Sequence, residues 1–594
     1  MTIQNKKQLI RTGLIASVLI LCFCVGLMMG KFVWRMPPKP SDYTTTHNIP
    51  AERGEILDCK GNVIATNRTV YDVHLDCCVI SNPDEWEEKS RLLSQELACL
   101  LPERSAPEWW TYLQKNRNQG RRYVPIAKDI DSTTMVRMMQ LPLLDQGKYR
   151  GGRIISSKMV RIYPYEPLAR RTIGIWRRHD QGHMFGLEGS YDTELRGKDG
   201  TRTVKHSVRR GRWRKWETDR DDKIDGQDIH TTIDMDLQAV ADSLLMEAMT
   251  EGEDLAGGCL ALMEVSTGEI KAIANSHRMD NGKVGEYFNY FIGHSYEPGA
   301  VVQTMTLAAV LSDGLITSLE EKIPTNKGRL HDSFCYYDDY IKAYERKYRT
   351  DSISVMNGFC MSSGYVAGDL ALRYKDSADY YYDWLRSFCI GSSDFDIRGM
   401  RELDLPASTP GDDLTLMATG RGYGFTVSPV QILAFYNAIA NGGKMMRPML
   451  VKGTGKDMDR MQHIESVQIR ERFIRPEVAD SLKKALARCV EDGTAEALKG
   501  LPVKVAGKTG TSRQVMDPEL RNGSTDPYQD TQGRRQYAGT FVGFYPADQP
   551  QYTLMCVLFT KPTYNMLYGG GKPALIAGEL IENIEETKKS FMTD

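Results

Sequence analysis

The longest hydrophobic run in the chain lies near its N-terminus. Residues 13–33 read GLIASVLILCFCVGLMMGKFV, with Lys31 as the one charged residue. About 20 apolar residues let a helix cross a bilayer, and a charge near the end can reach the interface. A cleaved signal peptide is the alternative, but the run exceeds a usual signal core and no A-x-A site follows it. We therefore expect a single transmembrane helix over residues 13–33.

The charges and prolines around this run predict its orientation. Basic residues precede the run and prolines follow it: Lys6, Lys7, Arg11, Pro37, Pro38 and Pro40. The positive-inside rule places a cytoplasmic tail at residues 1–12, although Lys31 and Arg35 weaken the asymmetry. Prolines favour a stiff stalk, which we place at residues 34–50. The expected topology is single-pass in the cytoplasmic membrane, with the C-terminal body outside the cytoplasm.

Residues 51–225 combine short strand and helix patterns without a catalytic motif. Residues 51–65 predict two short strands around a turn at Lys60-Gly61-Asn62. Asn82 before Pro83 is typical of a helix start, and leucines at helical spacing follow it. We interpret residues 51–225 as a support domain.

Residues 226–590 place strand patterns at both ends of a helical middle. A helical pattern runs from Asp234 to about Met249. The strands expected at the two ends, and a last helix, are residues 258–264, 269–274, 540–545, 552–559 and 574–587. Strands from both ends of one domain predict an antiparallel sheet with a helical subdomain, so we assign the α+β class.

The composition is that of an ordinary globular protein. The chain has 594 residues, with 76 Lys and Arg against 77 Asp and Glu, 41% hydrophobic residues and 26% charged residues. These values exclude a wholly disordered chain and a polytopic membrane protein. The net charge of −1 gives no general case for a nucleic-acid binder.

One local cluster of basic residues departs from this balance. Basic residues alternate with tryptophans at Lys205, Arg209, Arg210, Arg212, Trp213, Arg214, Lys215 and Trp216. A nucleic-acid patch is one interpretation. Three aspartates follow the cluster directly, at Asp219, Asp221 and Asp222. A nucleic acid is also no obvious ligand for a segment expected outside the membrane. We therefore favour a solvated hairpin, or a contact to a partner or to anionic lipid head groups.

The twelve cysteines and ten histidines form no recognisable metal or disulfide motif. Neither C-x-x-C nor H-E-x-x-H occurs, which argues against a zinc ribbon and a disulfide-stapled scaffold. Cys77, Cys78 and Cys99 could pair in an oxidising compartment, but buried thiols are favoured. We expect neither a metal site nor a cofactor.

A series of short motifs runs from the stalk to the C-terminal part of the chain. They are Arg53-Gly54-x-Ile56-x-Asp58, Arg161-x-Tyr163-Pro164, Gly186-Leu187-Glu188-Gly189-x-Tyr191, Leu195-x-Gly197-x-x-Gly200, Thr232-Ile233-Asp234, Tyr296-Glu297-Pro298-Gly299, Gly422-Tyr423-Gly424, Pro429-x-Gln431, Ala440-Asn441-Gly442-Gly443 and Ala506-Gly507-Lys508-Thr509-Gly510-Thr511. In this order they resemble the class B penicillin-binding proteins, the bitopic D,D-transpeptidases that cross-link peptidoglycan, and the septal members more than the elongation type. The resemblance implies an elongated pedestal of the dimerisation type over residues 51–225. It implies a serine β-lactamase-like transpeptidase domain over residues 226–590, in the periplasm.

The reaction of that family needs a serine and a lysine at S-x-x-K spacing. Three residues make about one helical turn, so both side chains share a face, and the helix N-terminus favours developing negative charge. Here Ala300 stands at the serine position and Gln303 at the lysine position. Alanine has no nucleophilic atom, and a glutamine amide accepts no proton near neutral pH. Loss of the nucleophile alone costs on the order of 10⁶ in rate in a comparable serine hydrolase.

The second motif, S-x-N in the family, is also altered. Its best match is Ser362-Ser363-Gly364, in which glycine stands at the asparagine position. Thr304 and Ser295 are the nearby candidates for a substitute nucleophile. Thr304 would sit deeper along the helix without a base at helical spacing, and Ser295 would need a different geometry. We therefore interpret Thr304 as a packed helix residue.

The third motif, K-T-G, is intact as Lys508-Thr509-Gly510-Thr511. Peptide binding along a strand edge and packing of the core explain it equally well. Gly507-Lys508-Thr509 also resembles the end of a phosphate-binding loop, but Pro502 stands where that loop needs a glycine. We reject ATP binding, and we interpret the run Gly569-Gly570-Gly571 as a structural turn.

Two hypotheses for the function follow. The first is a catalytically inactive scaffold or regulator of the wall-synthesis complex. The resemblance implies its partners: an inner-membrane SEDS-type glycan polymerase, divisome proteins and peptidoglycan stem peptide held without turnover. The alternative is an active peptidoglycan D,D-transpeptidase with an unusual nucleophile. The sequence leaves open whether Val301, Val302 and Tyr365 fill the cavity.

Overall fold

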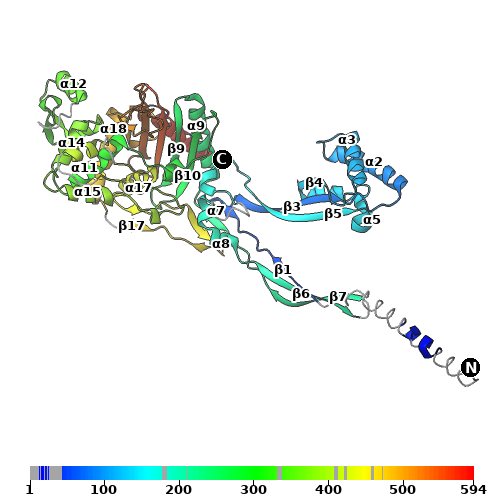
Figure 1. Cartoon of the computed structure of the whole chain (residues 1–594). Coiled ribbons are helices and arrows are strands. Elements are labelled where there is room, and N and C mark those ends of the chain that lie inside the picture. Colours follow the sequence, from blue (N-terminus) through cyan, green and yellow to red (C-terminus); the bar gives the residue numbers. More distant parts are fainter. Residues whose placement is uncertain are drawn as a thin grey trace, which may run out of the picture. The chain divides into compact units, whose positions relative to one another are not determined.

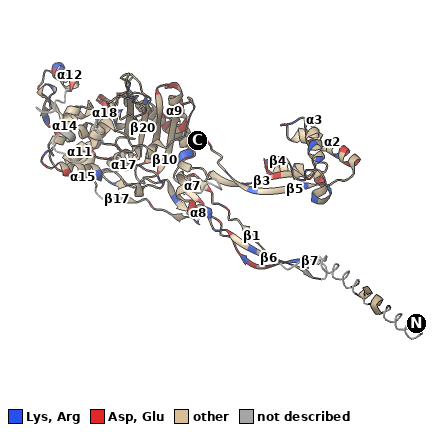
Figure 2. Ribbon diagram, in the orientation of Figure 1, with Lys and Arg blue, Asp and Glu red and all other residues tan. Residues whose placement is uncertain are grey.

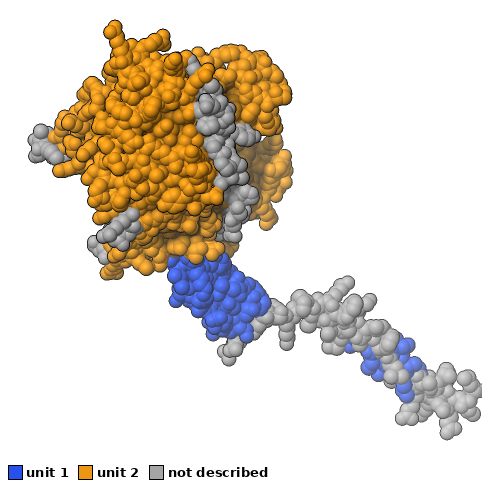
Figure 3. All heavy atoms as spheres, turned by 90° about the vertical axis from the view of Figure 1, so that its left-hand side faces the viewer, with its two compact units in different colours: residues 1–52, 197–225 blue, residues 53–196, 226–594 orange. Residues whose placement is uncertain are grey.

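The structure is a computed structural model of the chain. It describes residues 13, 15–18, 20–22, 25, 43–176, 184–209, 212–330, 338–406, 412–420, 425–456, 460–470 and 473–593. The chain forms two compact units, one of residues 1–52 and 197–225 and one of residues 53–196 and 226–594 (Figures 1 and 3).

The first unit contains a three-stranded antiparallel sheet in the order β1-β6-β7. Its strands are β1 (Tyr43–Ile49), β6 (Gly200–Arg209) and β7 (Arg212–Asp221). The β6–β7 hairpin carries basic and acidic residues along its length (Figure 2), and Arg202 pairs with Glu217 at 2.7 Å. The hairpin predicted for the basic cluster is confirmed, while Arg210 lies outside the described residues.

The second unit includes a mixed sheet in the order β16-β15-β8-β2-β3-β4, with β5 also paired to β3. The strands are β2 (Ile56–Leu57), β3 (Val63–Leu75), β4 (Val124–Ile130), β5 (Arg153–Ile162), β8 (Ile229–Thr231), β15 (Val451–Thr454) and β16 (Gln462–His463). β2 and β3 pair antiparallel around Gly61, as the sequence predicts. The same sheet takes strands from both the expected support domain and the C-terminal domain.

Helices accompany the part of this sheet that is made of β3, β4 and β5: α2 (Pro83–Leu100), α3 (Ala106–Asn118), α4 (Ser132–Met138), η1 (Leu144–Gln146) and α5 (Gly147–Arg150). Three short helices follow β5 in the chain and contribute to a different hydrophobic cluster: α6 (Arg170–Ile173), α7 (Gly186–Ser190) and α8 (Asp192–Arg196). Helix α2 begins where predicted, because the Asn82 side chain caps it by accepting the Asp84 N–H at 3.1 Å. Trp86 and Trp109 bury the two long helices against one core.

The large antiparallel sheet of the second unit has the order β11-β10-β9-β20-β19-β18. Its strands are β9 (Leu255–Glu264), β10 (Ile270–Arg278), β11 (Val284–Gly285), β18 (Ala506–Gln514), β19 (Gln536–Tyr545) and β20 (Tyr552–Thr560). Helices α9 (Met235–Glu251) and α19 (Lys572–Thr593) pack on one face, and α17 (Pro429–Ala440) on the other (Figure 1). The predicted sheet, completed by strands from both ends of the domain, is confirmed.

The helical subdomain lies between β11 and β18 in the sequence. Its helices are α10 (Tyr290–Gly293), η2 (Gly299–Val302), α11 (Gln303–Ser312), η3 (Asn326–Gly328), α12 (Asp339–Tyr348), α13 (Val355–Cys360), α14 (Gly364–Leu372), α15 (Ala378–Ser387), η4 (Ser392–Asp394), α16 (Asp412–Thr419), α18 (Pro476–Asp492) and η6 (Glu496–Leu498). Two small strand pairs accompany them, β12 (Lys322–Pro324) with β13 (Ser352–Ser354), and β14 (Met445–Met446) with β17 (Gln468–Arg470).

Several predictions for the N-terminus fall largely outside the described residues. These include the tail at 1–12, most of the apolar run at 13–33 and the stalk up to residue 42. Within the part of the chain that is described, no helix has the length and apolar character needed to span a bilayer. The motif at residues 422–424 also lies outside the described ranges.

The prediction of buried thiols in the support domain is only partly correct. Cys77 is buried, but Cys78 is half-buried and Cys99 is exposed. Cys99 stands in the last turn of α2, on the side away from Leu93 and Leu97, which enter the core. Helical period therefore decides the exposure of this thiol.

Candidate functional site

Position 300 lies at the start of the helix that faces β18. Ala300 belongs to the short 3₁₀ helix η2, and Gln303 begins α11 directly after it. Gly299 has φ +64° and packs on the backbone of Thr511, where a Cβ would lie 2.9 Å from the Thr511 nitrogen. Glycine is therefore required at 299, because a side chain would meet both steric and backbone strain.

The Gln303 side chain points to the second motif and takes part in no proton transfer there. Gln303 is 4% exposed, and its Nε2 donates to the backbone oxygen of Ser362 at 3.3 Å. Its Oε1 is buried and has no hydrogen-bond partner among the described residues. The amide thus bridges the helix to the Ser362 loop as a neutral donor, since it cannot take up a proton.

The three residues of the second motif have different roles. Ser362 has φ +56°, an unusual backbone conformation for a residue other than glycine, and its side chain faces Lys508. Ser363 is buried and caps α14, with its Oγ donating to Asp338 Oδ2 at 2.8 Å. Gly364 is the first residue of α14 and is buried. Of these three residues, only Ser362 therefore directs its side-chain oxygen toward Lys508.

Lys508 is the centre of the polar network. Its Nζ donates to Ser362 Oγ at 2.5 Å and to the Thr509 backbone oxygen at 3.3 Å. The side chain is fully buried and lies 5.5 Å from the ring centre of Phe359. Burial lowers the pKa of Lys508 to about 8, because the ammonium form loses its hydration. Lys508 is therefore closer to neutrality than an exposed lysine.

A threonine that the sequence analysis missed completes this network. Thr494, which follows α18, lies 3.2 Å from Ser362 Oγ and accepts a hydrogen bond from Thr509 Oγ1 at 2.6 Å. Asp338 was also missed, although it holds Ser363 and the Tyr365 N–H. No sequence pattern links these residues to the motifs, because they approach them only through the packing of separate helices.

The third motif lies within the first two thirds of β18, the edge strand of the large sheet. At Gly510 a Cβ would lie 2.7 Å from the Pro298 oxygen, so the absence of a side chain lets η2 approach the strand. The Thr511 hydroxyl accepts the Gly569 N–H at 3.1 Å. A Cβ on Gly569 would lie 2.3 Å from the Gly510 oxygen, which confirms the interpretation of the glycine run as a structural turn.

A cavity of about 370 Å³ opens beside the end of β18. Its walls combine polar strand residues with aromatic and apolar side chains: Glu297, Leu416, Thr511, Ser512, Arg513, Tyr528, Tyr537 and Met566. The cavity is therefore large enough for part of a peptide and offers both hydrogen-bonding groups and a cation.

Glu297 is the acidic group of this cavity, and it is 3% exposed. Burial raises its pKa to about 7, while the Tyr528 hydroxyl, which donates to Oε1 at 2.7 Å, acts in the opposite direction. Ser512 and Gln514 hold the Glu297 backbone against β18, at 2.5 Å and 3.0 Å from its oxygen. In the sequence, Glu297 is part of the Tyr296–Gly299 motif, and no local pattern predicts a role for its carboxyl group.

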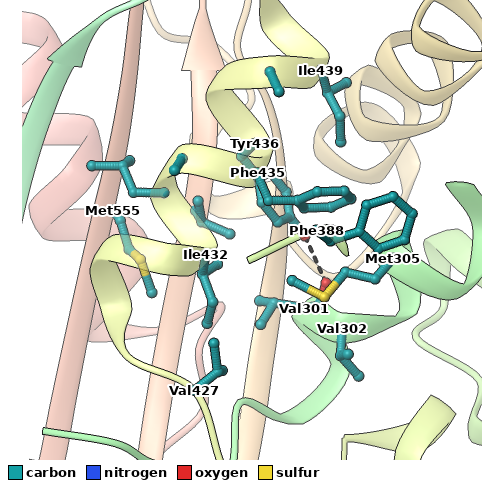
Figure 4. Close-up of a cluster of buried hydrophobic side chains, with 14 of the residues drawn as sticks. Val301, Val302, Met305, Phe388, Val427, Ile432, Phe435, Tyr436, Ile439 and Met555 are labelled. Carbon is teal, nitrogen blue, oxygen red and sulfur yellow. Dashed lines mark hydrogen bonds between the residues drawn. The ribbon is translucent and has the colours of Figure 1, made fainter. Parts of the chain in front are cut away.

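The substitute nucleophile at Thr304 is excluded by its surroundings. Thr304 is fully buried, and its Oγ1 lies 2.7 Å from the Tyr436 hydroxyl, which in turn donates to the Val301 oxygen at 2.9 Å. Val301 and Val302 lie beside Phe435 and Tyr436 in the hydrophobic core (Figure 4). Thr304 is therefore a packed helix residue, as predicted, and the two valines do not fill the cavity.

Tyr365 also lies in the core rather than in the cavity. It is 1% exposed, and its hydroxyl donates to the Pro324 oxygen at 2.8 Å and accepts from Asn326 at 3.2 Å. The site therefore keeps an open cavity, an edge strand and a buried lysine. It lacks a nucleophile and a base at positions 300 and 303.

Two family descriptions match the chain. The penicillin binding protein transpeptidase domain matches residues 258–582, and the penicillin-binding protein dimerisation domain matches residues 48–231.

Curated relatives are similar to almost the whole chain. Stage V sporulation protein D of Bacillus subtilis (strain 168) is 24% identical over 563 residues, covering 91% of this chain and 79% of that protein. Peptidoglycan D,D-transpeptidase FtsI of Escherichia coli (strain K12) is 25% identical over 599 residues, covering 96% and 91%.

Solved structures share the fold. Penicillin Binding Protein 2X from Streptococcus thermophilus superposes with a TM-score of 0.70 and 20% identity, covering 91% of this chain and 80% of that one. A peptidoglycan synthetase from Bifidobacterium adolescentis ATCC 15703 gives 0.65 and 18%, covering 92% and 97%. These likenesses confirm the expected α+β fold of an antiparallel sheet with a helical subdomain.

Proposed function

Because the chain belongs to the class B penicillin-binding proteins, we propose that it acts in peptidoglycan synthesis and cell division as a catalytically inactive scaffold or regulator. In this role it binds peptidoglycan stem peptide without forming an acyl-enzyme. The observation that carries the proposal is the pair Ala300 and Gln303, which stand where the family has its serine and lysine. Without the oxygen at 300, no ester with the peptide forms there.

Retained peptide binding is supported by the groups that remain. The edge strand β18 offers backbone hydrogen bonds to an extended peptide, and the cavity beside it is lined by Thr511 and Arg513. Lys508 adds a buried amine that orders Ser362. Substrate binding by Lys508, Thr509, Gly510 and Thr511 is therefore part of the proposal.

We further propose the location and partners of the protein. The apolar run at residues 13–33 serves as a single-pass anchor in the inner membrane, and the body lies in the periplasm. The partners are a SEDS-type glycan polymerase of that membrane and divisome proteins. Co-purification from membranes with such a polymerase tests this part.

Labelling by a fluorescent penicillin tests the catalytic part of the proposal. We expect the full chain to show no covalent adduct in a gel or in an intact-protein mass spectrum. We expect the double variant Ala300→Ser with Gln303→Lys to be labelled, because the network around Lys508 and the cavity are kept. The single variant Ala300→Ser is the matched control and should label at least about 100-fold more slowly, since it lacks the base.

Each other outcome contradicts part of the proposal. An adduct on the unchanged chain contradicts catalytic inactivity. A double variant that folds but stays unlabelled contradicts the retained peptide site, and Gly364 is then the next position to restore to asparagine.

One observation favours the second candidate function, an active D,D-transpeptidase with an unusual nucleophile. Ser362 Oγ lies 2.5 Å from the Nζ of Lys508, whose lowered pKa of about 8 suits a general base. If the unchanged chain is labelled, peptide mapping of the adduct to Ser362, with its loss in Ser362→Ala, supports this second function.

A further inference from the structure

Two buried cysteines meet directly beneath the Ser362–Lys508 network. Cys360 ends α13 and Cys489 lies in the last turn of α18, with exposures of 4% and 0%. The Cys360 thiol lies 3.9 Å from the backbone oxygen of Ala485. In an α-helix this oxygen accepts the N–H of the residue four positions later, which is Cys489. The two residues are 129 positions apart in the sequence, so the tertiary fold alone brings them together.

The backbones of the two cysteines also converge at one glycine. A Cβ on Gly493 would lie 2.6 Å from the Cys360 oxygen and 2.9 Å from the Cys489 Cα. Thr494 donates its N–H to the Cys360 oxygen at 3.2 Å, and Ala495 donates to the Cys489 oxygen at 3.1 Å. The ends of α13 and α18 are therefore joined by the backbone, and the thiols lie between them.

The electrostatic surroundings favour reactivity at one of the two sulfurs. A hydrogen bond from the Cys489 thiol lowers the pKa of Cys360; burial opposes this shift, and the charges of Arg488 and Lys508 support it, so that the net direction is downward. Burial raises the pKa of Cys489 well above its usual value. One thiol of low pKa beside one of high pKa is the arrangement in which the first attacks a disulfide and the second resolves it.

We propose that Cys360 and Cys489 form a reversible disulfide that joins the ends of α13 and α18 beneath the peptide site. The oxidant is a disulfide, either of a thiol oxidoreductase or of a small molecule such as oxidised glutathione. The Cys360 thiolate attacks that disulfide and releases one thiol, and the Cys489 sulfur then displaces the second thiol from Cys360. The protein loses two protons and two electrons, and the oxidant disulfide is reduced to two thiols.

The position of the pair links its redox state to the site. Cys360 is two residues before Ser362, and Thr494 follows Gly493, so the bond would fix the two loops that hold Ser362 Oγ. Because both thiols are buried, exchange takes place while the domain folds or opens locally. Any effect of this bond on stem-peptide binding rests on the proposed function, whereas the bond itself does not.

A second pair of buried cysteines provides a matched control. Cys259 on β9 stands opposite Val557, and Cys556 on β20 stands opposite Leu260, so the two cysteines are one register position apart. Neighbouring positions of a sheet point to opposite faces, and the two side chains indeed belong to different hydrophobic clusters. They therefore cannot bridge, although both are buried.

Equilibration in glutathione buffers tests the proposal. The full chain in detergent is incubated in oxidised or reduced glutathione with a disulfide isomerase, denatured, alkylated and digested. In the oxidised arm we expect a cross-linked Cys360–Cys489 peptide, with a mass about 2 Da below the sum of the two unalkylated peptides. In the reduced arm, and after dithiothreitol, both cysteines should be alkylated. The melting temperature should be roughly 5 °C higher in the oxidised arm.

Variants separate this pair from other thiols. Cys360→Ser should abolish both the cross-linked peptide and the difference in melting temperature, whereas Cys259→Ser should leave both unchanged. The proposal is overturned if Cys360 and Cys489 of the folded, unchanged chain stay fully alkylatable in the oxidised arm, or carry only separate glutathione adducts. These mass measurements do not depend on penicillin labelling, so the two proposals fail independently.

Discussion

At the residue scale, two side chains one helical turn apart limit the chemistry that positions 300 and 303 can supply. Ala300 supplies no oxygen, and the neutral amide of Gln303 donates to the Ser362 loop at 3.3 Å instead of accepting a proton. The neighbouring ionisable groups are still perturbed: burial raises the pKa of Glu297 and lowers that of Lys508. Perturbed groups cluster where a fold binds ligands, so Glu297 and Lys508 mark this part of the second unit as a candidate binding site.

The pH dependence of stability should report the Glu297 carboxyl. Its pKa is about 7 in the folded chain and about 4.3 in an unfolded one, so its stabilising contribution is lost as pH rises through 7. Glu297→Gln stays neutral at every pH. We therefore expect the variant to gain on the order of 2 kcal/mol in free energy of unfolding, relative to the unchanged chain, between pH 5 and pH 8. Urea unfolding at the two pH values measures this gain.

The control for this measurement is Glu519→Gln, at an exposed position on the segment that follows β18. It should show no such pH-dependent gain. A Glu297→Gln difference that is the same at pH 5 and pH 8 would contradict the raised pKa.

At the scale of elements, the site depends on how closely η2 packs against β18. Gly299 and Gly510 remove two side chains from this contact, and a Cβ at Gly510 would meet the Pro298 oxygen and Val301. The motif glycine thus has a packing role whether or not a peptide binds. The strand that carries the K-T-G motif contributes buried residues to the core, while Thr511 and Arg513 near its end line the cavity.

Gly510→Ala should destabilise the domain by about 1–3 kcal/mol, because the new methyl group would lie 2.7 Å from a backbone oxygen. Chemical denaturation measures the loss. Gly391→Ala is the matched control, since a Cβ there would have its nearest neighbour at 3.6 Å, and it should change stability by less than about 0.5 kcal/mol. Equal losses in the two variants would show that close packing at η2 does not matter.

At the scale of the whole molecule, one buried carboxylate joins segments that are distant in the sequence. Glu188 is fully buried and pairs with Arg53 and Arg161, at 2.7 Å and 2.8 Å, and Tyr163 donates to it at 3.2 Å. These residues belong to three of the motifs in the first half of the chain. Their conspicuous spacing in the sequence therefore reflects one ion-pair network in the second unit.

Glu188→Gln should cost about 3–5 kcal/mol, because it leaves the buried Arg161 guanidinium without a countercharge and Arg53 with only its second partner, Asp192. The midpoint of urea unfolding measures this loss. The exposed pair of Glu87 with Arg91, four residues apart on α2, is the control, and Glu87→Gln should cost less than about 0.5 kcal/mol. If both variants unfold at the same urea midpoint, the buried ion-pair network stabilises the fold no more than the exposed pair does.

The sequence alone determined the local features of this protein. Patterns within a few residues predict helix starts such as Asn82 and the strands at the two ends of the domain. The residue types at positions 300 and 303 are read directly from the sequence. Local propensity and side-chain chemistry depend on neighbours in the chain, so a pattern is enough to predict them.

The tertiary structure decided which distant residues meet. Thr494 at Ser362, Asp338 at Ser363, Cys489 at Cys360 and the cavity beside Glu297 arise from contacts between separate helices and strands. Burial, which sets the pKa values of Lys508 and Glu297, is a property of the packed core as a whole. No window of sequence contains these contacts, because the packing of elements far apart in the chain creates them.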